Sequence, residues 1–220
     1  MGYEPAGPVK LTSNFTPPVV LNLGETEIVY VATDSLNNTD SCKFIVSVLD
    51  TLPPFINGCP QDITVYYDPG AGGGVPTWIP PVIIDNCTMS SVVSNYNPGD
   101  TLPCYTTQVI YLAVDQSGNA ATCSFDVVVL DSIPPVFSNC PSDLTIDVLA
   151  GTCKGVLQWQ VPTVFDNCTA NVKVVSNFAP NDTLVVGTYQ VVYTAIDDSG
   201  NTSTCTFAVK VSENVAPTIT

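Results

Sequence analysis

The pattern of apolar and polar residues predicts short β-strands throughout the chain. In CSFDVVV (123–129) and CTFAVKV (205–211), cysteine, phenylalanine and valine occupy alternate positions, as they do in CKFIVSV (42–48). Successive side chains of a strand point to opposite faces, so this alternation predicts strands with one face on a core. Upstream, TTQVIYLAVD and TYQVVYTAID are rich in the β-branched and aromatic residues that strands favour. No segment has a convincing 3.6-residue period, so we expect an all-β protein.

Tight turns are predicted between these strand pairs. The sequence SGN lies between two of the pairs, and its Gly118 and Gly200 suit a positive φ angle. The first copy has Asn37 at this place, the next best residue for that conformation.

The whole pattern repeats with a period of 81 residues. The stretch DTLPPFINGCPQD at 50–62 returns as DSIPPVFSNCPSD at 131–143, and a third copy begins with VAPTIT at 215–220. We therefore predict the second half of a repeat at 1–50, complete repeats at 51–131 and 132–212, and the start of a further repeat at 213–220. Paired prolines in the joints restrict the chain to extended conformations and limit bending.

About seven short strands per repeat, separated by frequent turn signals, predict the fold class. We expect tandem immunoglobulin-like antiparallel β-sandwich repeats of about 81 residues, arranged end to end.

Nine cysteines without histidine or a CxxC pair indicate disulfides rather than a zinc site. Each complete repeat has one cysteine that opens its first predicted strand and one that opens its last, which predicts the bonds Cys59–Cys123 and Cys140–Cys205. Two further bonds, Cys87–Cys104 and Cys153–Cys168, are predicted because a cysteine lost at one position is matched by one gained at another. Cys42 is left unpaired because its partner would lie in the missing first half of its repeat; a reactive or intermolecular thiol is the alternative.

These motifs resemble the hyalin repeat, or HYR, domain family. The resemblance rests on DxxPPxxxxCPxD, on a predicted strand that contains Trp78 or Trp159 and leads to proline and DN, on SNxxPxDT, and on YxAxDxSGNxxxCxFxVxV. It covers essentially the whole chain, although residues 32–38 read ATDSLNN. The resemblance implies an immunoglobulin-like fold, a place in long extracellular proteins and a role linked to adhesion. It brings no catalytic residues.

Charge and composition exclude several classes of function. Twenty acidic residues against five lysines and no arginine argue against nucleic acid as a partner. No apolar run is long enough for a membrane-spanning helix, and the disulfides point to an extracellular or cell-surface location. The start, MGYEPAGPVK, lacks a signal-peptide pattern, so we expect a mature product or a segment of a longer chain. Histidine and arginine are absent, so we predict that the chain is not an enzyme.

Calcium is the cofactor considered, and no other is expected. Aspartates recur at the joints, in the DNC motifs and in the turns, and hard cations prefer oxygen ligands at such clusters. The calcium candidates are Asp50, Asp85, Asp115, Asp131, Asp166 and Asp197. The competing interpretation is that these aspartates cap turns through their own backbone.

Asn-X-Ser/Thr sequons add candidate glycosylation sites. They occur at Asn14, Asn37, Asn86, Asn167, Asn181 and Asn201.

The sequence thus predicts a structural segment of an extracellular fibre, stalk or surface filament, whose partners are neighbouring repeats or identical chains. Two alternatives remain open. One is an adhesin that binds a glycan or protein receptor through loops. The other is a filament subunit that assembles by strand exchange through its incomplete first repeat.

Overall fold

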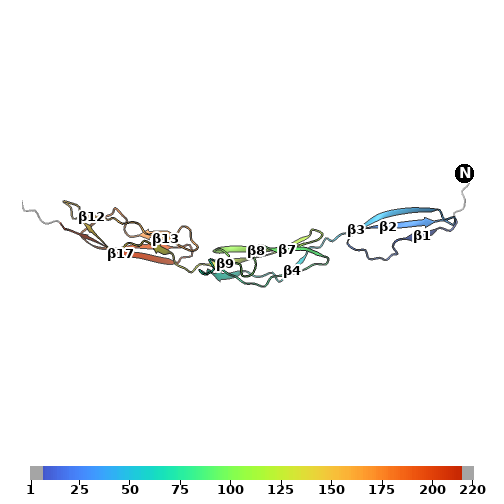
Figure 1. The fold of residues 1–220 in the computed structure, drawn as a ribbon, viewed down its shortest axis with the longest axis horizontal. Coiled ribbons are helices and arrows are strands. Elements are labelled where there is room, and N and C mark those ends of the chain that lie inside the picture. Colours follow the sequence, from blue (N-terminus) through green and yellow to red (C-terminus); the bar gives the residue numbers. More distant parts are fainter. Residues whose placement is uncertain (1–6, 215–220) are drawn as a thin grey trace, which may run out of the picture. The chain divides into compact units, whose positions relative to one another are not determined.

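Every regular element in residues 7–214, the part of the chain that the computed structural model describes, is a β-strand (Figure 1). The predicted all-β class is therefore confirmed, and no helix of the described residues is long and apolar enough to cross a membrane. The chain divides into two compact units, of residues 1–60, 80–95 and 110–124, and of residues 61–79, 96–109 and 125–220. The boundary passes through the middle repeat. Most of the predicted start of a further repeat, at 213–220, lies outside the described residues.

The first repeat contributes one antiparallel sheet with the strand order β1-β2-β3. Its strands are β1 (Lys10–Ser13), β2 (Gly24–Thr33) and β3 (Thr39–Val48). The side chain of Phe44 is 50% exposed here, whereas its counterparts Phe125 and Phe207 are 3% exposed. The face that carries the core in the later repeats is therefore open in this sheet.

The middle repeat has a four-stranded sheet, β5-β9-β8-β7, and a two-stranded sheet, β4-β6. The strands are β4 (Phe55–Asn57), β5 (Ile63–Tyr66), β6 (Val82–Ile84), β7 (Met89–Ser94), β8 (Tyr105–Asp115) and β9 (Ala120–Leu130). In β9, Cys123, Phe125, Val127 and Val129 are buried, and Ser124 between them is exposed. The alternation read from the sequence thus defines the core face of this strand.

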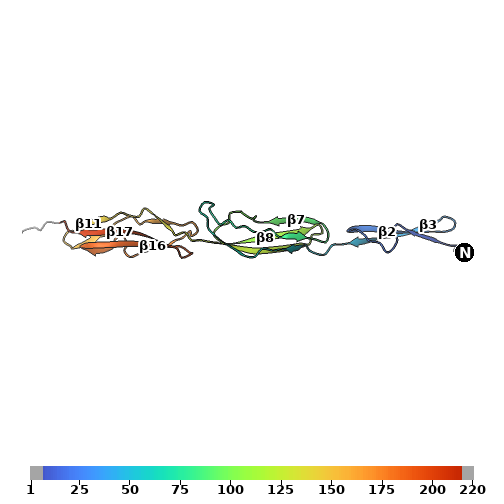
Figure 2. The same ribbon diagram turned by 90° about the horizontal axis from the view of Figure 1, so that it is seen from below.

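The third repeat has an equivalent four-stranded sheet, β11-β17-β16-β14, of which Figure 2 labels β11, β16 and β17. It has two two-stranded pairs, β10-β13 and β12-β15, where the middle repeat has one pair and an isolated bridge between Gly74 and Leu102. Its strands are β10 (Val136–Ser138), β11 (Leu144–Asp147), β12 (Lys154–Val156), β13 (Thr163–Phe165), β14 (Lys173–Ser176), β15 (Thr183–Val185), β16 (Gly187–Ile196) and β17 (Thr202–Ser212). Strands β16 and β17 form a hairpin, in register from Gly187↔Val211 to Ile196↔Thr202. The strand β11 pairs with β17 in parallel, as β5 does with β9, so the sandwich is not purely antiparallel.

The core of the third repeat lies between these sheets. Val191, Val209 and Leu157 are fully buried there, and each such side chain contributes about 1.5–3 kcal/mol through its removal from water. The indole of Trp159 packs edge-on against Phe207, at 5.3 Å between ring centres, and donates a hydrogen bond to the Tyr193 hydroxyl. Trp159 lies in an irregular segment rather than in the predicted strand, because its ring fills the core while its backbone makes no strand pairing.

The predicted turn geometry is confirmed. Asn37, Gly118 and Gly200 have φ angles of 65°, 91° and 88°. The prediction that Cys59 and Cys140 open the first strand of their repeats is wrong. Both cysteines lie in the connections that follow β4 and β10.

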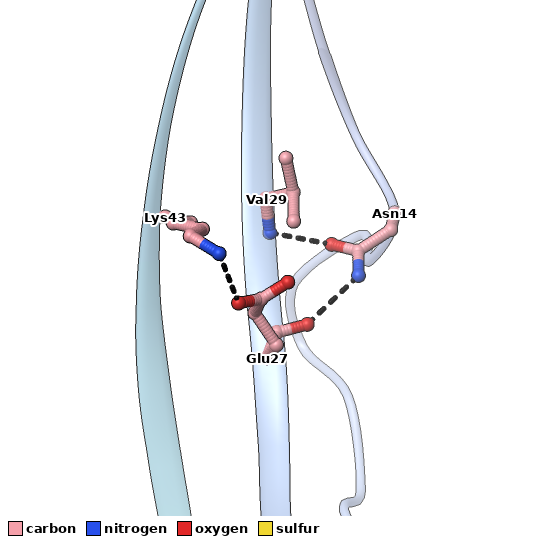
Figure 3. Close-up of polar contacts among 4 residues, drawn as sticks. All are labelled: Asn14, Glu27, Val29 and Lys43. Carbon is pink, nitrogen blue, oxygen red and sulfur yellow. Dashed lines mark hydrogen bonds and ion pairs between the residues drawn. The ribbon is translucent and has the colours of Figure 1, made fainter.

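An asparagine in each SN motif joins the end of its strand to the strand that pairs with it. In the first repeat, Asn14 accepts a hydrogen bond from the Val29 N–H and donates one to the Glu27 carbonyl, beside the ion pair of Lys43 with Glu27 (Figure 3). In the third repeat, Asn177 accepts from the Val192 N–H at 2.8 Å and donates to the Gln190 carbonyl at 2.9 Å. The side-chain amide therefore completes the sheet where the backbone ladder ends.

Replacing this amide should weaken the repeat. We expect Asn177→Ala to lower the free energy of unfolding of the third repeat by about 1–3 kcal/mol, because the Val192 N–H and the Gln190 carbonyl lose their partner. Asn177→Asp keeps the acceptor for Val192 and should cost less. Urea denaturation would measure both, and an Asp variant as unstable as the Ala variant would contradict the assignment.

Candidate metal centre

Two groups of three aspartates form at equivalent positions in successive repeats. The first is Asp50, Asp85 and Asp115, the second Asp131, Asp166 and Asp197, and one carboxylate oxygen from each member lies within 4.8 Å of the others. Two oxygens on opposite sides of one Ca²⁺ ion, each about 2.4 Å from it, are separated by about this distance. All six predicted calcium candidates are thus brought together, three to each cluster.

The backbone explains why residues far apart in sequence meet. In the first cluster, Asp50 lies in the joint before β4, Asp85 follows β6, and Asp115 ends β8. Asp50 Oδ1 accepts hydrogen bonds from the Leu52 N–H and from the Asn86 amide. One pairing of antiparallel strands, β4 with β6, therefore holds the first two aspartates at the same end of the repeat.

In each cluster, one asparagine side chain donates hydrogen bonds to two of the three aspartates. Asn119 donates from its amide to the Asp115 carboxylate at 2.7 Å and to the Asp50 carbonyl at 3.1 Å. In the second cluster, Asn201 donates to the Asp197 carboxylate at 2.8 Å and to the Asp131 carbonyl at 3.3 Å. The turn of each repeat is thereby fastened to the joint that precedes the repeat.

Each cluster contains carboxylate oxygens that are buried and have no hydrogen-bond partner among the described residues. They are Asp50 Oδ2 and Asp85 Oδ1 in the first cluster, and Asp131 Oδ2 and Asp166 Oδ2 in the second. A buried charged oxygen without a partner is costly, and buried charges are normally paired or bound to metal. The same unsatisfied positions occur in two repeats, which makes an accidental defect a poor explanation.

The charge of the clusters is not balanced by basic side chains. Within the described residues, the Lys43 ammonium forms an ion pair with the Glu27 carboxylate, with 2.9 Å between Nζ and Oε1, and this pair involves neither cluster. Hydrogen bonding from Asn86 holds the pKa of Asp50 below its ordinary value. Partial desolvation, followed by the nearby Asp50 carboxylate, raises the pKa of the Cys87 thiol, which therefore stays protonated at neutral pH.

The turn-capping interpretation is also correct for part of each cluster. Asp34, the counterpart of Asp115 in the first repeat, accepts hydrogen bonds from the Asn38 N–H and the Asn38 amide. These bonds lower the pKa of Asp34, and they form although Asp34 is in neither cluster. Capping therefore accounts for the Asp115 and Asp197 turns, but not for the unsatisfied oxygens of the other four aspartates.

The structure contains the long-range disulfides Cys59–Cys123 and Cys140–Cys205, with Cα–Cα distances of 5.9 and 5.8 Å. Each joins the connection after the first strand of a repeat to the last strand of that repeat. Cys42 is free and exposed, as the sequence predicts.

The predicted bonds Cys87–Cys104 and Cys153–Cys168 are wrong. Cys104 is bonded to Cys168, with a Cα–Cα distance of 5.6 Å, and Cys87 and Cys153 are free and exposed.

The length of one strand explains the error. Cys153 lies beside Val186, immediately before β16, whereas Thr169, next to Cys168, binds Asp198 just after β16. The ten residues of β16 span about 34 Å, far beyond the roughly 7 Å between Cα atoms that a disulfide tolerates. The 11-residue β8 separates Cys87 from Cys104 in the same manner.

The structure separates the six sequons into two groups. The side-chain nitrogens of Asn14, Asn86, Asn167 and Asn201 donate hydrogen bonds to the backbone or to cluster aspartates. Asn37 and Asn181 are exposed, and Asn181 uses its side-chain oxygen to accept a bond from Gln158. Asn37 and Asn181 are therefore the better glycosylation candidates.

Together, the sheets, disulfides and paired acidic clusters define a tandem array of immunoglobulin-like β-sandwich repeats, and the disulfides fit an extracellular protein. The chain belongs to the HYR domain family, whose model matches residues 49–129 and 130–211. The predicted family resemblance is confirmed.

Two of its relatives are named hyalin. Hyalin of Strongylocentrotus purpuratus is 33% identical over 210 residues, which cover 91% of this chain and 17% of the relative. Hyalin of Lytechinus variegatus is 33% identical over 193 residues, covering 86% of this chain and 36% of the relative. The chain thus spans a minor part of these relatives. A solved structure of mouse cadherin-23, EC22–24, is 14% identical to this chain. The match covers 93% of this chain and 86% of the cadherin chain, and its TM-score of 0.36 is too low to carry an argument.

Proposed function

We propose that this chain is a structural, non-enzymatic segment of an extracellular fibre, stalk or surface filament, in which each joint is stiffened by a bound calcium ion. The observation that carries the proposal is the pair of equivalent aspartate clusters with buried, unsatisfied oxygens. HYR repeats and long-range disulfides supply the architecture, and a role linked to adhesion is what the family resemblance implies.

The donor set suits Ca²⁺ better than other ions. It offers carboxylate oxygens, with neighbouring amide and backbone oxygens, and Ca²⁺ takes six to eight oxygen ligands in flexible geometry. Zn²⁺ prefers nitrogen and sulfur, and the chain has no histidine. A cation at Asp50, Asp85 and Asp115 would bridge the joint, the segment after β6 and the turn after β8, and would hold three separate segments in one place.

Calorimetric titration of the intact chain with CaCl₂, after treatment with a chelator, tests the site. We expect two ions per chain, with dissociation constants of about 10⁻⁴ to 10⁻³ M, the range of extracellular calcium modules. Asp85→Asn should remove one ion, and Asp34→Asn, which alters an equivalent turn outside the clusters, should remove none. Undetectable binding by the chain at 10 times these concentrations would exclude calcium.

The mechanical role has a separate test. Pulling the chain by its ends in single-molecule force spectroscopy should give higher unfolding forces in calcium than in chelator, because the ion must leave before the joint opens. It should also give higher forces in oxidising than in reducing buffer. Equal forces in all four conditions would contradict a tension-bearing segment even if calcium binds.

An adhesin is the second candidate function. A pocket of about 330 Å³ lies beside the second joint and is lined by apolar and aromatic residues that include Tyr67, Pro134 and Phe165. Aromatic surfaces of this kind stack on sugar rings. Binding of the intact chain to a glycan array, lost in Phe165→Ala, would favour this candidate.

A filament subunit that assembles by strand exchange is the third candidate function. The exposed Phe44 on the open face of the first sheet would be covered if a neighbouring chain supplied strands. Electron microscopy decides this point: ordered fibres favour assembly through that face, and isolated chains exclude it.

A further inference from the structure

Cys153 lies at the end of the third repeat that corresponds to the end of the middle repeat where Cys104 lies. The repeat offset places Val186 at the position of Cys104, and Gly72 at the position of Cys153. Each complete repeat therefore has a cysteine at one of these two positions and none at the other.

The two positions are neighbours in space. Val186 donates a backbone hydrogen bond to the Cys153 carbonyl at 3.3 Å, and the adjacent residues Lys154 and Val185 are paired between β12 and β15. Cys153 is exposed and free, and Val186 is 48% exposed. A thiol at either position is thus presented from the same end of the repeat.

The middle repeat shows what such a thiol does. Cys104 is bonded to Cys168, the cysteine of the DNC motif in the repeat that follows. Tyr105, held at a φ angle of 72°, places its hydroxyl 3.5 Å from the Cys168 carbonyl. Cys104 is thus bonded across a joint, and the observed bond is one between repeats.

From this geometry we infer that Cys153 forms the same bond across the next joint, with the DNC cysteine of another HYR repeat docked at the 153/186 end of the third repeat. In this step the two thiols lose two protons and two electrons, and a sulfur–sulfur bond forms. A small-molecule disulfide of the oxidising compartment accepts the electrons and is reduced to two thiols.

The free cysteines of the chain fit this scheme. Cys87 is also a DNC cysteine, and it is unpaired in the structure because the preceding sheet has Leu23 at the position of Cys104. The exchange of cysteine between two neighbouring positions keeps one such cysteine in each complete repeat, which pairing within a repeat does not explain. This inference does not depend on calcium.

The test adds a second copy of residues 131–220 after Ser212 of the full chain and maps disulfides by mass spectrometry without reduction. We expect Cys153 of the first copy to be bonded to Cys168 of the second. Cys153→Ser should abolish this cross-link, and adding Val186→Cys to that variant should restore it. Cys42→Ser is the matched control and should leave the cross-link unchanged.

The bonds Cys104–Cys168 and Cys140–Cys205, read in the same map, report that the extended chain is folded. With these bonds in place, an alkylatable Cys153 would overturn the inference. A Cys153–Cys153 dimer, or failure of Val186→Cys to restore the bond, would also overturn it.

Discussion

Replacing Cys140 and Cys205 together by alanine should lower the free energy of unfolding of the third repeat by about 4 kcal/mol in the chain-entropy account of disulfides. The bond closes a loop with a sequence separation of 65 residues, so its loss frees most of the repeat in the unfolded state. A domain of about 80 residues has a stability of the same order, so the variant should be near its unfolding midpoint at ambient temperature.

The two tryptophans allow the unfolding of each complete repeat to be measured separately. Trp78 packs against Phe125 in the middle repeat, and Trp159 packs against Phe207 in the third. In a Trp78→Phe background, the fluorescence of Trp159 follows the third repeat alone during urea denaturation. Cys153→Ala, at an exposed free cysteine of the same repeat, is the control and should leave the midpoint unchanged. An equal midpoint for the double variant would show that the bond adds no stability.

Local features of the fold could be predicted from the sequence because short-range physics determines them. The alternation of Phe207, Val209 and Val211 defines a buried strand face whatever lies opposite. Gly200 and Asn37 indicate a positive φ angle because few other residues adopt it cheaply. The parallel pairing of β11 with β17 has no such local signal, since it depends on which strand the chain folds back upon.

The site could be predicted in its residues but not in its arrangement. The recurrence of Asp85 and Asp166 in DNC marks them as candidates, yet nothing in the sequence shows that one oxygen of each is buried without a partner. The prediction of two of the disulfides was wrong for a related reason. Pairing of Cys104 with Cys168 crosses a joint, and counting cysteines within each repeat cannot reveal it.

Calcium should stabilise the third repeat, and one substitution separates the metal site from the turn. At a concentration 100 times the dissociation constant, binding to the folded state alone contributes about 2.7 kcal/mol. Asp166 uses Oδ1 to accept hydrogen bonds from the Cys168 and Thr169 N–H groups, whereas its Oδ2 is buried without a partner. Asp166→Asn can keep the first oxygen as an acceptor and replaces the second with an amide nitrogen, which cannot bind calcium.

The melting temperature of the third repeat should therefore respond differently to Asp166→Asn in chelator and in calcium. Trp159 fluorescence in the Trp78→Phe background follows this unfolding. In chelator, Asp166→Asn should unfold at a higher temperature than the parent, because removing one of three clustered charges relieves repulsion. In calcium, only the parent should be stabilised further, and this gain should shrink as the pH falls, because protons compete with the ion for the carboxylates. Asp34→Asn should respond to calcium like the parent. A calcium shift of equal size in Asp166→Asn would place the ion elsewhere, and a lower melting temperature of that variant in chelator would show that the cluster is stable without a cation.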